Sequence, residues 1–340
     1  MKLKKITFAS PGEVVVGTVE EGLEIQSPTE VIVRNRFSLV SAGTELACLA
    51  GGEAWFRLPR TPGYAAVGEV VQKGGAVTKV NNGDLVFTHG PHAEYFKIDT
   101  TDRYNGICLG LPPGIRPDHA LFTRMASIAI ASIRVAHIEV GDQVLVTGLG
   151  LVGNLAAQLA ILQGANVVGA DLSAVRCACA RECGIARTVD AQNADWVEQV
   201  RGLSGGRGVT TAIDATGLSS VVTEVIPLVA QFGEVVLLGT PRAPFETNAT
   251  EIYSHIHLPG YVALKGALEW RYPTFRDEFV KHSVERNSEI IMELIASGKL
   301  HIAPLYTHKV APEAAAEVYA GLRGKKDEYV GVVFDWTQAP

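Results

Sequence analysis

The segment from Gly141 to Gly153 constrains the fold of this chain more than any other. It reads Gly-Asp-Gln-Val-Leu-Val-Thr-Gly-Leu-Gly-Leu-Val-Gly, a turn and a short apolar run that lead into a Gly-x-Gly-x-x-Gly spacing at Gly148, Gly150 and Gly153. In such a motif the first glycine makes a tight turn, the second lets backbone approach a diphosphate, and the third lets helix and strand pack closely. A helix that begins there offers free N–H groups and a positive dipole end to phosphates. The segment therefore predicts a strand, a dinucleotide-binding turn and a helix.

Repeated strand and helix patterns surround this segment. Short apolar runs predict strands at Val144–Thr147, Val167–Asp171, Thr211–Asp214, Val235–Gly239 and near Tyr261–Leu264. Between them, helical patterns predict helices at Asn154–Leu162, Ala174–Glu182 and Val221–Val229. Strands that alternate with helices imply a parallel sheet covered on both faces. We expect an α/β, doubly wound Rossmann domain over residues 119–267.

The rest of the chain has a different pattern. Before residue 118, turns rich in Gly, Pro and Asn separate short β-branched runs at Val14–Val16, Val31–Val33, Gly68–Val71 and Asp84–Phe87. Short strands with frequent turns are typical of a barrel or sandwich. After residue 268 the pattern is mixed: Phe275–Ser297 predicts one or two amphipathic helices, and Tyr329–Phe334 predicts a final strand.

Composition excludes several classes of protein. The 340 residues are 47% hydrophobic and 19% charged, so the chain builds a core rather than staying disordered. The net charge of −6 gives no basic footprint for nucleic acid. No apolar run reaches the ~18 residues of a membrane span, and Pro11-Gly12-Glu13 stand where a signal peptide would be apolar. The five cysteines contain no CxxC pair, which favours a reducing, cytoplasmic location.

Asp171 ends the second predicted strand of the Rossmann domain. It lies close to the position, about 20 residues past the last glycine, where a carboxylate binds the adenosine ribose. A carboxylate there repels a 2′-phosphate, so we expect NADH to bind more tightly than NADPH. Arg176 is the residue that could soften this preference.

These features resemble the medium-chain dehydrogenase/reductase superfamily, and especially its alcohol, sorbitol and threonine dehydrogenases. The resemblance covers nearly the whole chain and includes Asp214–Gly217 and Leu237–Gly239. It implies a β-rich, GroES-like catalytic domain made of residues 1–118 and 268–340, with nicotinamide bound between the two domains. The cofactor-binding residues that we expect are Gly148, Gly150, Leu151, Val152, Gly153, Asp171, Leu172, Arg176, Thr216, Leu238, Gly239, Lys265 and Gly266.

The ligands of the family's catalytic zinc are missing from the matching segments. Ala42 stands where the family has a cysteine, and Tyr64 stands where its Gly-His-Glu segment has the histidine. Thr123–Met125, where another acidic or cysteine ligand often occurs, contains neither. Zinc needs thiolate, imidazole or carboxylate ligands. We therefore expect no metal at this site.

The family's four-cysteine structural zinc lobe is also missing. It would fall between Asp84 and His92, an interval that is far too short and contains no cysteine. The motifs Ser41–Glu45 and Pro62–Tyr64 look most like a zinc-less branch of the superfamily that includes the bacteriochlorophyllide dehydrogenases. The Cys177-x-Cys179-x-x-x-Cys183 run is not a metal site either, because helical positions two apart face different sides.

Without zinc, a side chain must handle the proton that accompanies hydride transfer. Tyr64 is the first candidate, because it replaces a metal ligand and its hydroxyl carries a proton. Thr44 matches the family's proton-relay hydroxyl, and Glu45 matches an acid beside the metal site, where it could instead orient a neighbour. Three weaker candidates are a further hydroxyl and two loop imidazoles that titrate near neutral pH: Ser41, His89 and His92. Ordinary alternatives stay open, namely a barrel tyrosine, a turn hydroxyl and solvated loop histidines.

Trp55, Arg57 and Trp270 are candidate substrate residues. By family position the Trp55 loop could cap the substrate cleft, with its aromatics stacked on a ring and an arginine on an anionic group. The alternative is a solvated arginine beside a small satellite core cluster.

Three functions remain open. The leading one is an NAD(H)-dependent, zinc-independent dehydrogenase of a secondary alcohol on a sugar, polyol or ring-bearing compound. The second is a zinc-free reductase of an activated C=C bond, whose relatives usually prefer NADPH. The third is a dinucleotide-binding protein without catalysis. The expected partners are a small-molecule substrate and a second copy in a homodimer, since an exposed edge strand near Ile256–Leu264 could pair about a twofold axis. No nucleic acid or membrane is expected.

Overall fold

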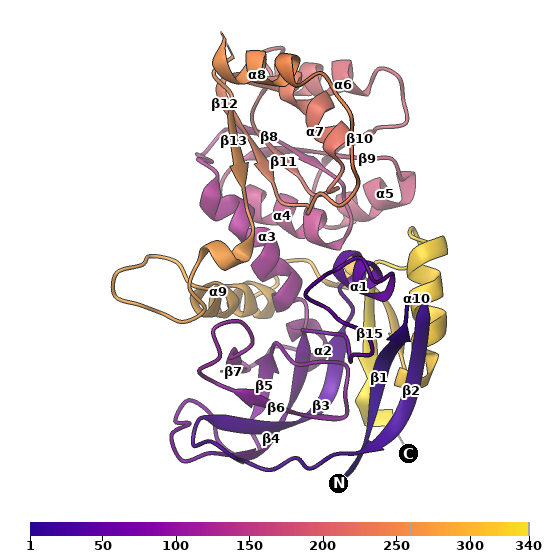
Figure 1. The fold of residues 1–340 in the computed structure, drawn as a ribbon. Coiled ribbons are helices and arrows are strands. Elements are labelled where there is room, and N and C mark those ends of the chain that lie inside the picture. The colour runs from indigo at the N-terminus through magenta and orange to yellow at the C-terminus, as the bar shows by residue number, and fades with distance from the viewer. Residues whose placement is uncertain (259, 339–340) are drawn as a thin grey trace. The chain divides into compact units, whose positions relative to one another are not determined.

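The computed structural model describes residues 1–258 and 260–338. By its contacts the chain forms two compact units (Figure 1). The first comprises Met1–Arg124 together with the described residues from Tyr272 onward, and the second is Met125–Arg271. In the described part of the chain, no helix combines the length and the hydrophobicity needed to cross a bilayer.

The second unit is built on a six-stranded sheet with the order β10-β9-β8-β11-β12-β13, in which all neighbours are parallel. The strands are β8 (Gln143–Thr147), β9 (Asn166–Asp171), β10 (Arg187–Asp190), β11 (Val209–Asp214), β12 (Val229–Leu237) and β13 (Ala263–Gly266). The helices are α3 (Thr123–Val135, which starts at the unit boundary), α4 (Leu151–Leu162), α5 (Ala174–Glu182), α6 (Trp196–Leu203), α7 (Ser219–Val225) and α8 (Ala249–His257). The doubly wound α/β fold expected from the sequence is confirmed.

The strand order of this sheet reverses at one point. Going outward from its centre, β8 is followed on one side by β9 and on the other by β11, so the order reverses between β8 and β11. In open α/β sheets, ligands bind outside the carboxyl ends of the strands at such a reversal. The glycine motif follows β8 and therefore lies at this point. The apolar core beneath includes Leu145, Val168 and Ala212.

Two expectations for this unit are wrong in detail. The helix expected at Val221–Val229 ends at Val225, because Pro227 lacks an N–H donor and Val229 already begins β12. The edge strand expected near Ile256–Leu264 is also displaced, since Ile256 lies in α8 and the edge strand is β13. Within the expected range, Pro259 lies outside the described residues.

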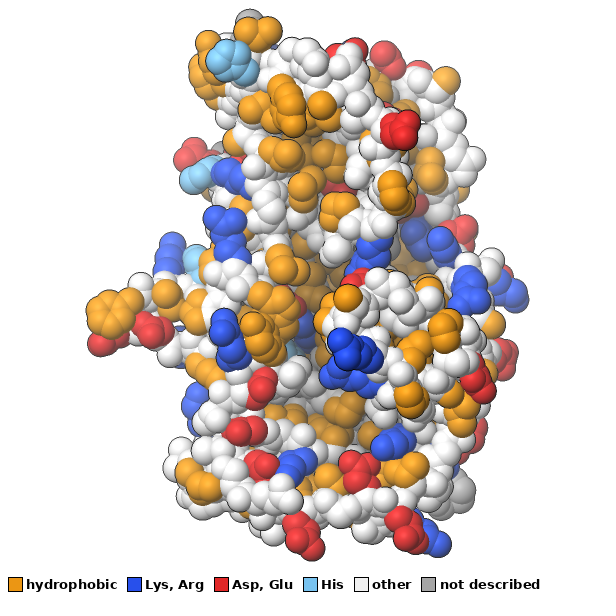
Figure 2. Space-filling model, viewed as in Figure 1, with side chains coloured by type: hydrophobic (Ala, Val, Ile, Leu, Met, Phe, Trp, Pro, Cys, Tyr) orange, Lys and Arg blue, Asp and Glu red, His pale blue; other side chains and the backbone are white. Residues whose placement is uncertain are grey.

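The surface beside β13 is apolar. Hydrophobic side chains are exposed over α8, β12 and β13 (Figure 2), among them Phe232 at 75%, Tyr253 at 66% and Leu264 at 45% exposure. An edge strand flanked by apolar surface favours association with another chain. The homodimer stays a prediction.

The first unit is β-rich. Its main sheet has the order β14-β15-β3-β4-β5-β7, with β6 also paired to β3, and β1 and β2 form a separate hairpin. The strands are β1 (Lys2–Ser10), β2 (Glu13–Glu20), β3 (Glu30–Leu39), β4 (Ala66–Lys73), β5 (Leu85–Thr88), β6 (Tyr95–Asp99), β7 (Cys108–Gly110), β14 (Tyr306–Val310) and β15 (Gly331–Asp335). The helices are α1 (Ala42–Leu49), α2 (Pro117–Ala120), α9 (Val284–Ala296) and α10 (Ala315–Gly324).

The C-terminal segment completes this unit. β15 pairs antiparallel with β3 through Val333 and Leu39, so the last strand of the described residues joins the first domain, as the family resemblance implied. One helix prediction is too long: Phe275–Ser283 is not helical, and α9 begins at Val284 after Ser283, whose hydroxyl accepts the Arg286 N–H at 3.1 Å. Such a cap fixes where a helix begins.

Candidate functional site

The glycine motif forms the turn between β8 and α4. Gly148 has a φ of +83°, and a Cβ added there would lie 2.9 Å from a Thr216 methyl. A Cβ on Gly153 would lie 1.8 Å from the Gly148 carbonyl oxygen, whereas one on Gly150 would meet nothing closer than Arg176 Nη1 at 3.8 Å. The geometry thus requires glycine at positions 148 and 153, and leaves open space beside position 150.

The start of α4 suits an anion. Gly150 is its N-cap and no side chain caps the helix, so the first-turn N–H groups at Leu151 and Val152 have no side-chain partner there. Free N–H groups and the helix dipole together bind phosphate at a helix N-terminus. With the open space beside Gly150, this arrangement fits the diphosphate of a dinucleotide.

Asp171 ends β9 next to this turn. Its carboxylate is 7% exposed and accepts the Leu149 N–H at 2.6 Å and the Ser173 N–H at 2.8 Å. A carboxylate has about four acceptor sites, so these bonds orient Asp171 and leave capacity for ribose hydroxyls. Arg176 Nη1 lies 3.9 Å from the carboxylate, which puts a cation where a 2′-phosphate would need one. Leu172, the next residue, is 59% exposed.

Asp214 organises the neighbouring loop, and reasoning from the sequence did not single out its side chain. Its carboxylate accepts the hydroxyls of Thr147 at 3.1 Å and Thr216 at 2.6 Å, and the Gly217 N–H at 3.1 Å. A Cβ on Gly239 would lie 2.2 Å from the Gly217 nitrogen, so the two loops meet backbone to backbone. The carboxyl ends of β8, β11 and β12 are therefore tied together.

The other expected cofactor residues lie nearby on this sheet. Leu238 N–H donates to the Asp214 carbonyl at 2.8 Å, and Gly266 pairs with Leu237 at the end of β13. The Lys265 ammonium is engaged by the buried carboxylate of Glu234. A role for Lys265 toward the cofactor stays a prediction.

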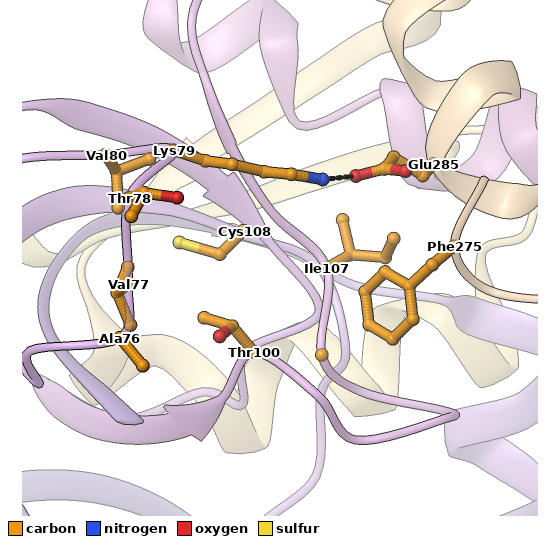
Figure 3. Close-up of a pocket in the computed structure, with 11 residues that line it drawn as sticks. Ala76, Val77, Thr78, Lys79, Val80, Thr100, Ile107, Cys108, Phe275 and Glu285 are labelled. Carbon is orange, nitrogen blue, oxygen red and sulfur yellow. Dashed lines mark hydrogen bonds and ion pairs between the residues drawn. The ribbon is translucent and has the colours of Figure 1, made fainter. Parts of the chain in front are cut away.

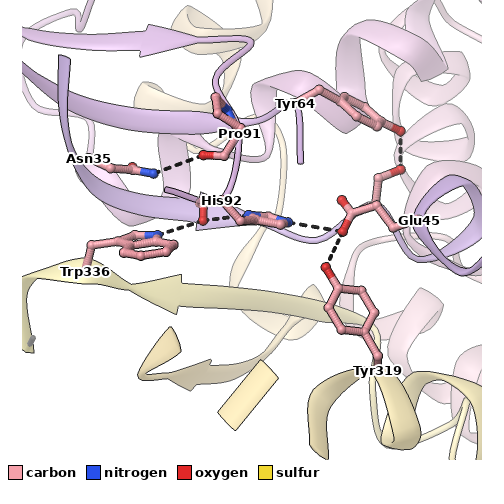
Figure 4. Close-up of polar contacts among 9 residues, drawn as sticks. Asn35, Glu45, Tyr64, Pro91, His92, Tyr319 and Trp336 are labelled. Atoms are coloured by element: carbon pink, nitrogen blue, oxygen red, sulfur yellow. Dashed lines mark hydrogen bonds and ion pairs between the residues drawn. The ribbon is translucent and has the colours of Figure 1, made fainter. Parts of the chain in front are cut away.

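In the first unit, Tyr64 lies in a polar cluster with Ser41 and Thr44. The Tyr64 hydroxyl donates to Ser41 Oγ (Figure 4), and the Thr44 hydroxyl also hydrogen-bonds to Tyr64. Ser41 precedes α1 without capping it, so its hydroxyl remains for this contact. The structure thus brings together the three hydroxyl candidates.

Arg124 belongs to the same cluster and was missed as a site residue by reasoning from the sequence. Its side chain is 3% exposed, and its guanidinium carbon lies 4.8 Å from the centroid of the Tyr64 ring. Burial raises the pKa of Tyr64, and the positive charge of Arg124 opposes this rise, as do the hydrogen bonds of Ser41 and Thr44. The sequence signal that could have identified Arg124 is its position as the one charged residue in the mostly apolar segment Ala120–Ile130.

Glu45 and His92 form a buried network behind these hydroxyls (Figure 4). His92 Nε2 lies 3.1 Å from Glu45 Oε2, and its Nδ1 lies 2.8 Å from Ser38 Oγ. Glu45 also accepts the Tyr319 hydroxyl at 2.5 Å and the Ser41 N–H at 2.8 Å. The alternative of a solvated loop histidine is wrong for His92, which is 0% exposed. Through these contacts Glu45 orients the turn at Ser41.

His89 is also buried, at 5% exposure, so it is not a solvated loop histidine either. Its Nδ1 lies 3.2 Å from the Tyr104 carbonyl oxygen. Burial and the charge of Arg124 hold the pKa of His89 well below its usual range, so the imidazole is neutral at neutral pH. This shift moves the imidazole away from titration near pH 7, and a role for His89 as the proton shuttle stays a prediction.

The expected substrate loop is anchored through its middle residue. Phe56 packs in the core of the first unit, while Trp55 is 57% exposed and donates its indole N–H to Glu53 at 2.9 Å. Arg57 is exposed. The substrate roles of Trp55 and Arg57 stay predictions. Trp270 lies in a short turn of the second unit, Glu269–Arg271.

The donor set around Tyr64 does not suit zinc. Hydroxyls and a guanidinium replace the thiolate, imidazole and carboxylate ligands that zinc takes. Among the described residues, no group of three His, Cys, Asp or Glu side chains is placed to hold a metal. None of the five cysteines forms a disulfide. The Cys177 thiol donates to the Val189 carbonyl oxygen, whereas the Cys179 thiol is hydrogen-bonded to that of Cys183, so the two face different sides of α5.

A cavity of about 140 Å³ lies elsewhere in the first unit (Figure 3). Lys79 and Glu285 pair across it, and Phe275 and Ile107 form part of its apolar wall. Burial raises the pKa of the Cys108 thiol in its lining to about 12, which keeps this thiol protonated. None of the expected site residues lines this cavity.

Comparison with known proteins matches both units. Residues 27–122 match the family model of the alcohol dehydrogenase GroES-like domain, and residues 152–275 match that of a zinc-binding dehydrogenase. D-guloside 3-dehydrogenase of Shigella flexneri is 27% identical over 277 residues, which cover 80% of this chain and 77% of that protein.

Solved structures show the same fold. Galactitol-1-phosphate dehydrogenase from Escherichia coli superposes with a TM-score of 0.84 at 19% identity, over 98% of this chain and 99% of that one. A structure described as a zinc-binding dehydrogenase from Sinorhizobium meliloti 1021, bound to NADP, gives 0.79 at 22% identity with the same coverage.

Proposed function

Because this chain belongs to the medium-chain, alcohol dehydrogenase-like superfamily and is an oxidoreductase acting on CH–OH groups, we propose that it is an NAD(H)-dependent, zinc-independent dehydrogenase of a secondary alcohol. The proposed substrate class is a sugar, a polyol or a ring-bearing hydroxyl compound, and relatives named for a guloside and for galactitol 1-phosphate support it. The observation that carries the proposal is the glycine turn at the reversal of strand order, with Asp171 beside it.

The second unit would hold the cofactor. The N-terminus of α4 would take the diphosphate, and Asp171 would bind the hydroxyls of the adenosine ribose. When bound, the nicotinamide supplies or accepts the hydride, and the protein only has to orient the substrate and move a proton.

Tyr64 is the proposed proton donor and acceptor. In the reducing direction its O–H passes the proton to the substrate oxygen, and the hydroxyls of Ser41 and Thr44 can then donate to the tyrosinate. In the oxidising direction the tyrosinate takes the proton from the substrate hydroxyl. Glu45 and His92 hold the Ser41 turn in place.

The test of the function is turnover on a panel of secondary alcohols, sugars, polyols and activated enones, with each nicotinamide cofactor. Oxidation of polyols or sugars with NAD⁺ is the expected result. Reduction of enones alone would favour the C=C reductase, and NADH binding without any turnover would favour a non-catalytic protein. The same proposal includes a cytoplasmic location, which five cysteines without a disulfide suit.

We expect NADH to bind more tightly than NADPH, since the Asp171 carboxylate repels a 2′-phosphate. Asp171→Asn removes the charge but keeps the shape of the side chain. In a fluorescence titration, this variant should bring the ratio of the NADH and NADPH affinities closer to one. Asp142→Asn is the control, because Asp142 lies before the opposite end of β8. Equal affinities in the unmodified protein would remove Asp171 from this role, and Arg176 would then be the residue that decides.

Catalysis should not depend on zinc, because the donor set around Tyr64 lacks zinc ligands. After dialysis against a chelator, elemental analysis should find far less than one zinc per chain, and turnover should be unchanged. A stoichiometric zinc whose removal abolishes turnover would contradict the proposal.

A further inference from the structure

Arg124 carries the strongest unassigned feature of the first unit. A charged side chain that is 3% exposed is rare unless its charge has a task or a partner. The guanidinium lies over the face of the Tyr64 ring, 4.8 Å from guanidinium carbon to ring centroid. Arginine stays protonated at any physiological pH, so this site contains a permanent positive charge.

We propose that Arg124 is a positioning residue whose fixed charge, held against the Tyr64 ring, keeps the Tyr64 hydroxyl usable as the proton donor and acceptor. This inference rests on the proposed function, in which Tyr64 moves the proton. It gives a protein side chain the electrostatic task that a divalent cation performs in a zinc site, namely stabilising negative charge on oxygen.

The groups around Tyr64 determine how strongly the charge of Arg124 affects its hydroxyl. The described groups that act on Tyr64 are Arg124, Glu45, and the hydroxyls of Ser41 and Thr44. Glu45 disfavours a tyrosinate, whereas Arg124 and the two hydroxyls favour it, and Arg124 contributes most among these three. His89 is held neutral, and the imidazole of His92 is occupied by Glu45 and Ser38. Arg124 is the group in this described set whose positive charge does not depend on pH.

The proton step shows where the charge acts. When Tyr64 gives its proton to the substrate oxygen, the O–H bond of the phenol breaks, an O–H bond forms on the substrate, and the electron pair stays on the phenolate. That anion faces the guanidinium until a proton from solvent restores the phenol. In a partly buried site of low dielectric, a guanidinium whose carbon lies 4.8 Å from the ring centroid favours the charged form of the phenol.

The titration of Tyr64 itself tests the proposal without any substrate. The protein is labelled with 3-fluorotyrosine, whose phenol titrates at lower pH than tyrosine, and followed by ¹⁹F NMR. Among the nine tyrosines, the Tyr64 signal is the one that Tyr64→Phe lacks. Arg124→Gln should raise the pH midpoint of this signal by about one unit or more, equivalent to roughly a tenfold change in the equilibrium. Arg124→Lys, which keeps the positive charge, should return the midpoint most of the way to that of the unmodified protein.

Arg103→Gln is the matched control, since Arg103 lies 4.9 Å from the ring of the exposed Tyr104 and should leave the Tyr64 signal unchanged. If Arg124→Gln does not fold, Arg124→Met, which keeps the apolar stem, replaces it. An unchanged Tyr64 midpoint in a folded variant without the charge overturns the proposal. The pH profile of kcat should shift in the same direction. Failure of turnover on every substrate would remove the proposed function but would leave the NMR result intact, so the two failures can be told apart.

Discussion

Replacing Tyr64 with phenylalanine should lower turnover at least about tenfold, because general acid–base catalysis by a placed side chain typically contributes a factor of 10²–10⁴. The change removes only the hydroxyl, whose partners are Ser41 and Thr44. NADH affinity should stay the same, since the glycine turn that would bind the cofactor lies in the other unit. Steady-state kinetics and a binding titration on the same preparation measure the two effects.

Tyr104→Phe is the control for this experiment. Tyr104 is 45% exposed, and its loss of a hydroxyl should change neither rate nor binding. If Tyr64→Phe turns over as fast as the unmodified protein, Tyr64 is an ordinary barrel tyrosine. Thr44 and Ser41 then become the next hydroxyls to test.

Gly153→Ala should destabilise the second unit strongly and abolish cofactor binding. The new Cβ would lie 1.8 Å from the Gly148 carbonyl oxygen, a backbone atom that cannot move without breaking the turn. Overpacking a tight contact lowers the free energy of unfolding by about 1–3 kcal/mol and sometimes more. For Gly153→Ala we expect a loss of about 3 kcal/mol or more. Chemical denaturation should show a lower free energy of unfolding, and cofactor binding should be lost.

Gly150→Ala separates packing from binding. Its Cβ would meet no atom closer than 3.8 Å, so the fold should keep nearly its full stability. The methyl group would instead occupy the space through which a diphosphate approaches the backbone, so NADH affinity should fall. A Gly150→Ala variant with unchanged affinity would show that the diphosphate does not bind beside this residue.

The Rossmann unit was largely predictable because its signals are local. The run from Gly141 to Gly153 gave strand, turn and helix in one segment, and α5 was predicted with both ends correct. The end of α7 differs from the prediction because the apolar run continues past Val225, whereas Pro227 ends the α-helical hydrogen bonding. β10 and α6 were missed because four and eight residues with mixed exposure leave a weak pattern.

The first unit was less predictable because its order depends on pairings between distant segments. No local pattern shows that β15 pairs with β3, or that Tyr319 donates to Glu45 from a position 274 residues later in the sequence. The same is true of the site. The hydroxyls of Ser41 and Tyr64 were foreseen by position, whereas the burial of His89 and His92 depends on neighbours that only the fold supplies.

The pairing of β15 with β3 has a consequence for how the chain is made. A ribosome must synthesise residues 331–335 before β3 obtains this neighbour, whereas Met125–Arg271 is one continuous stretch whose strands all precede that point. The second unit can therefore fold while translation continues, and the first unit is completed last. Until then Ser38 also lacks the indole of Trp336, which donates to it at 2.9 Å in the finished protein.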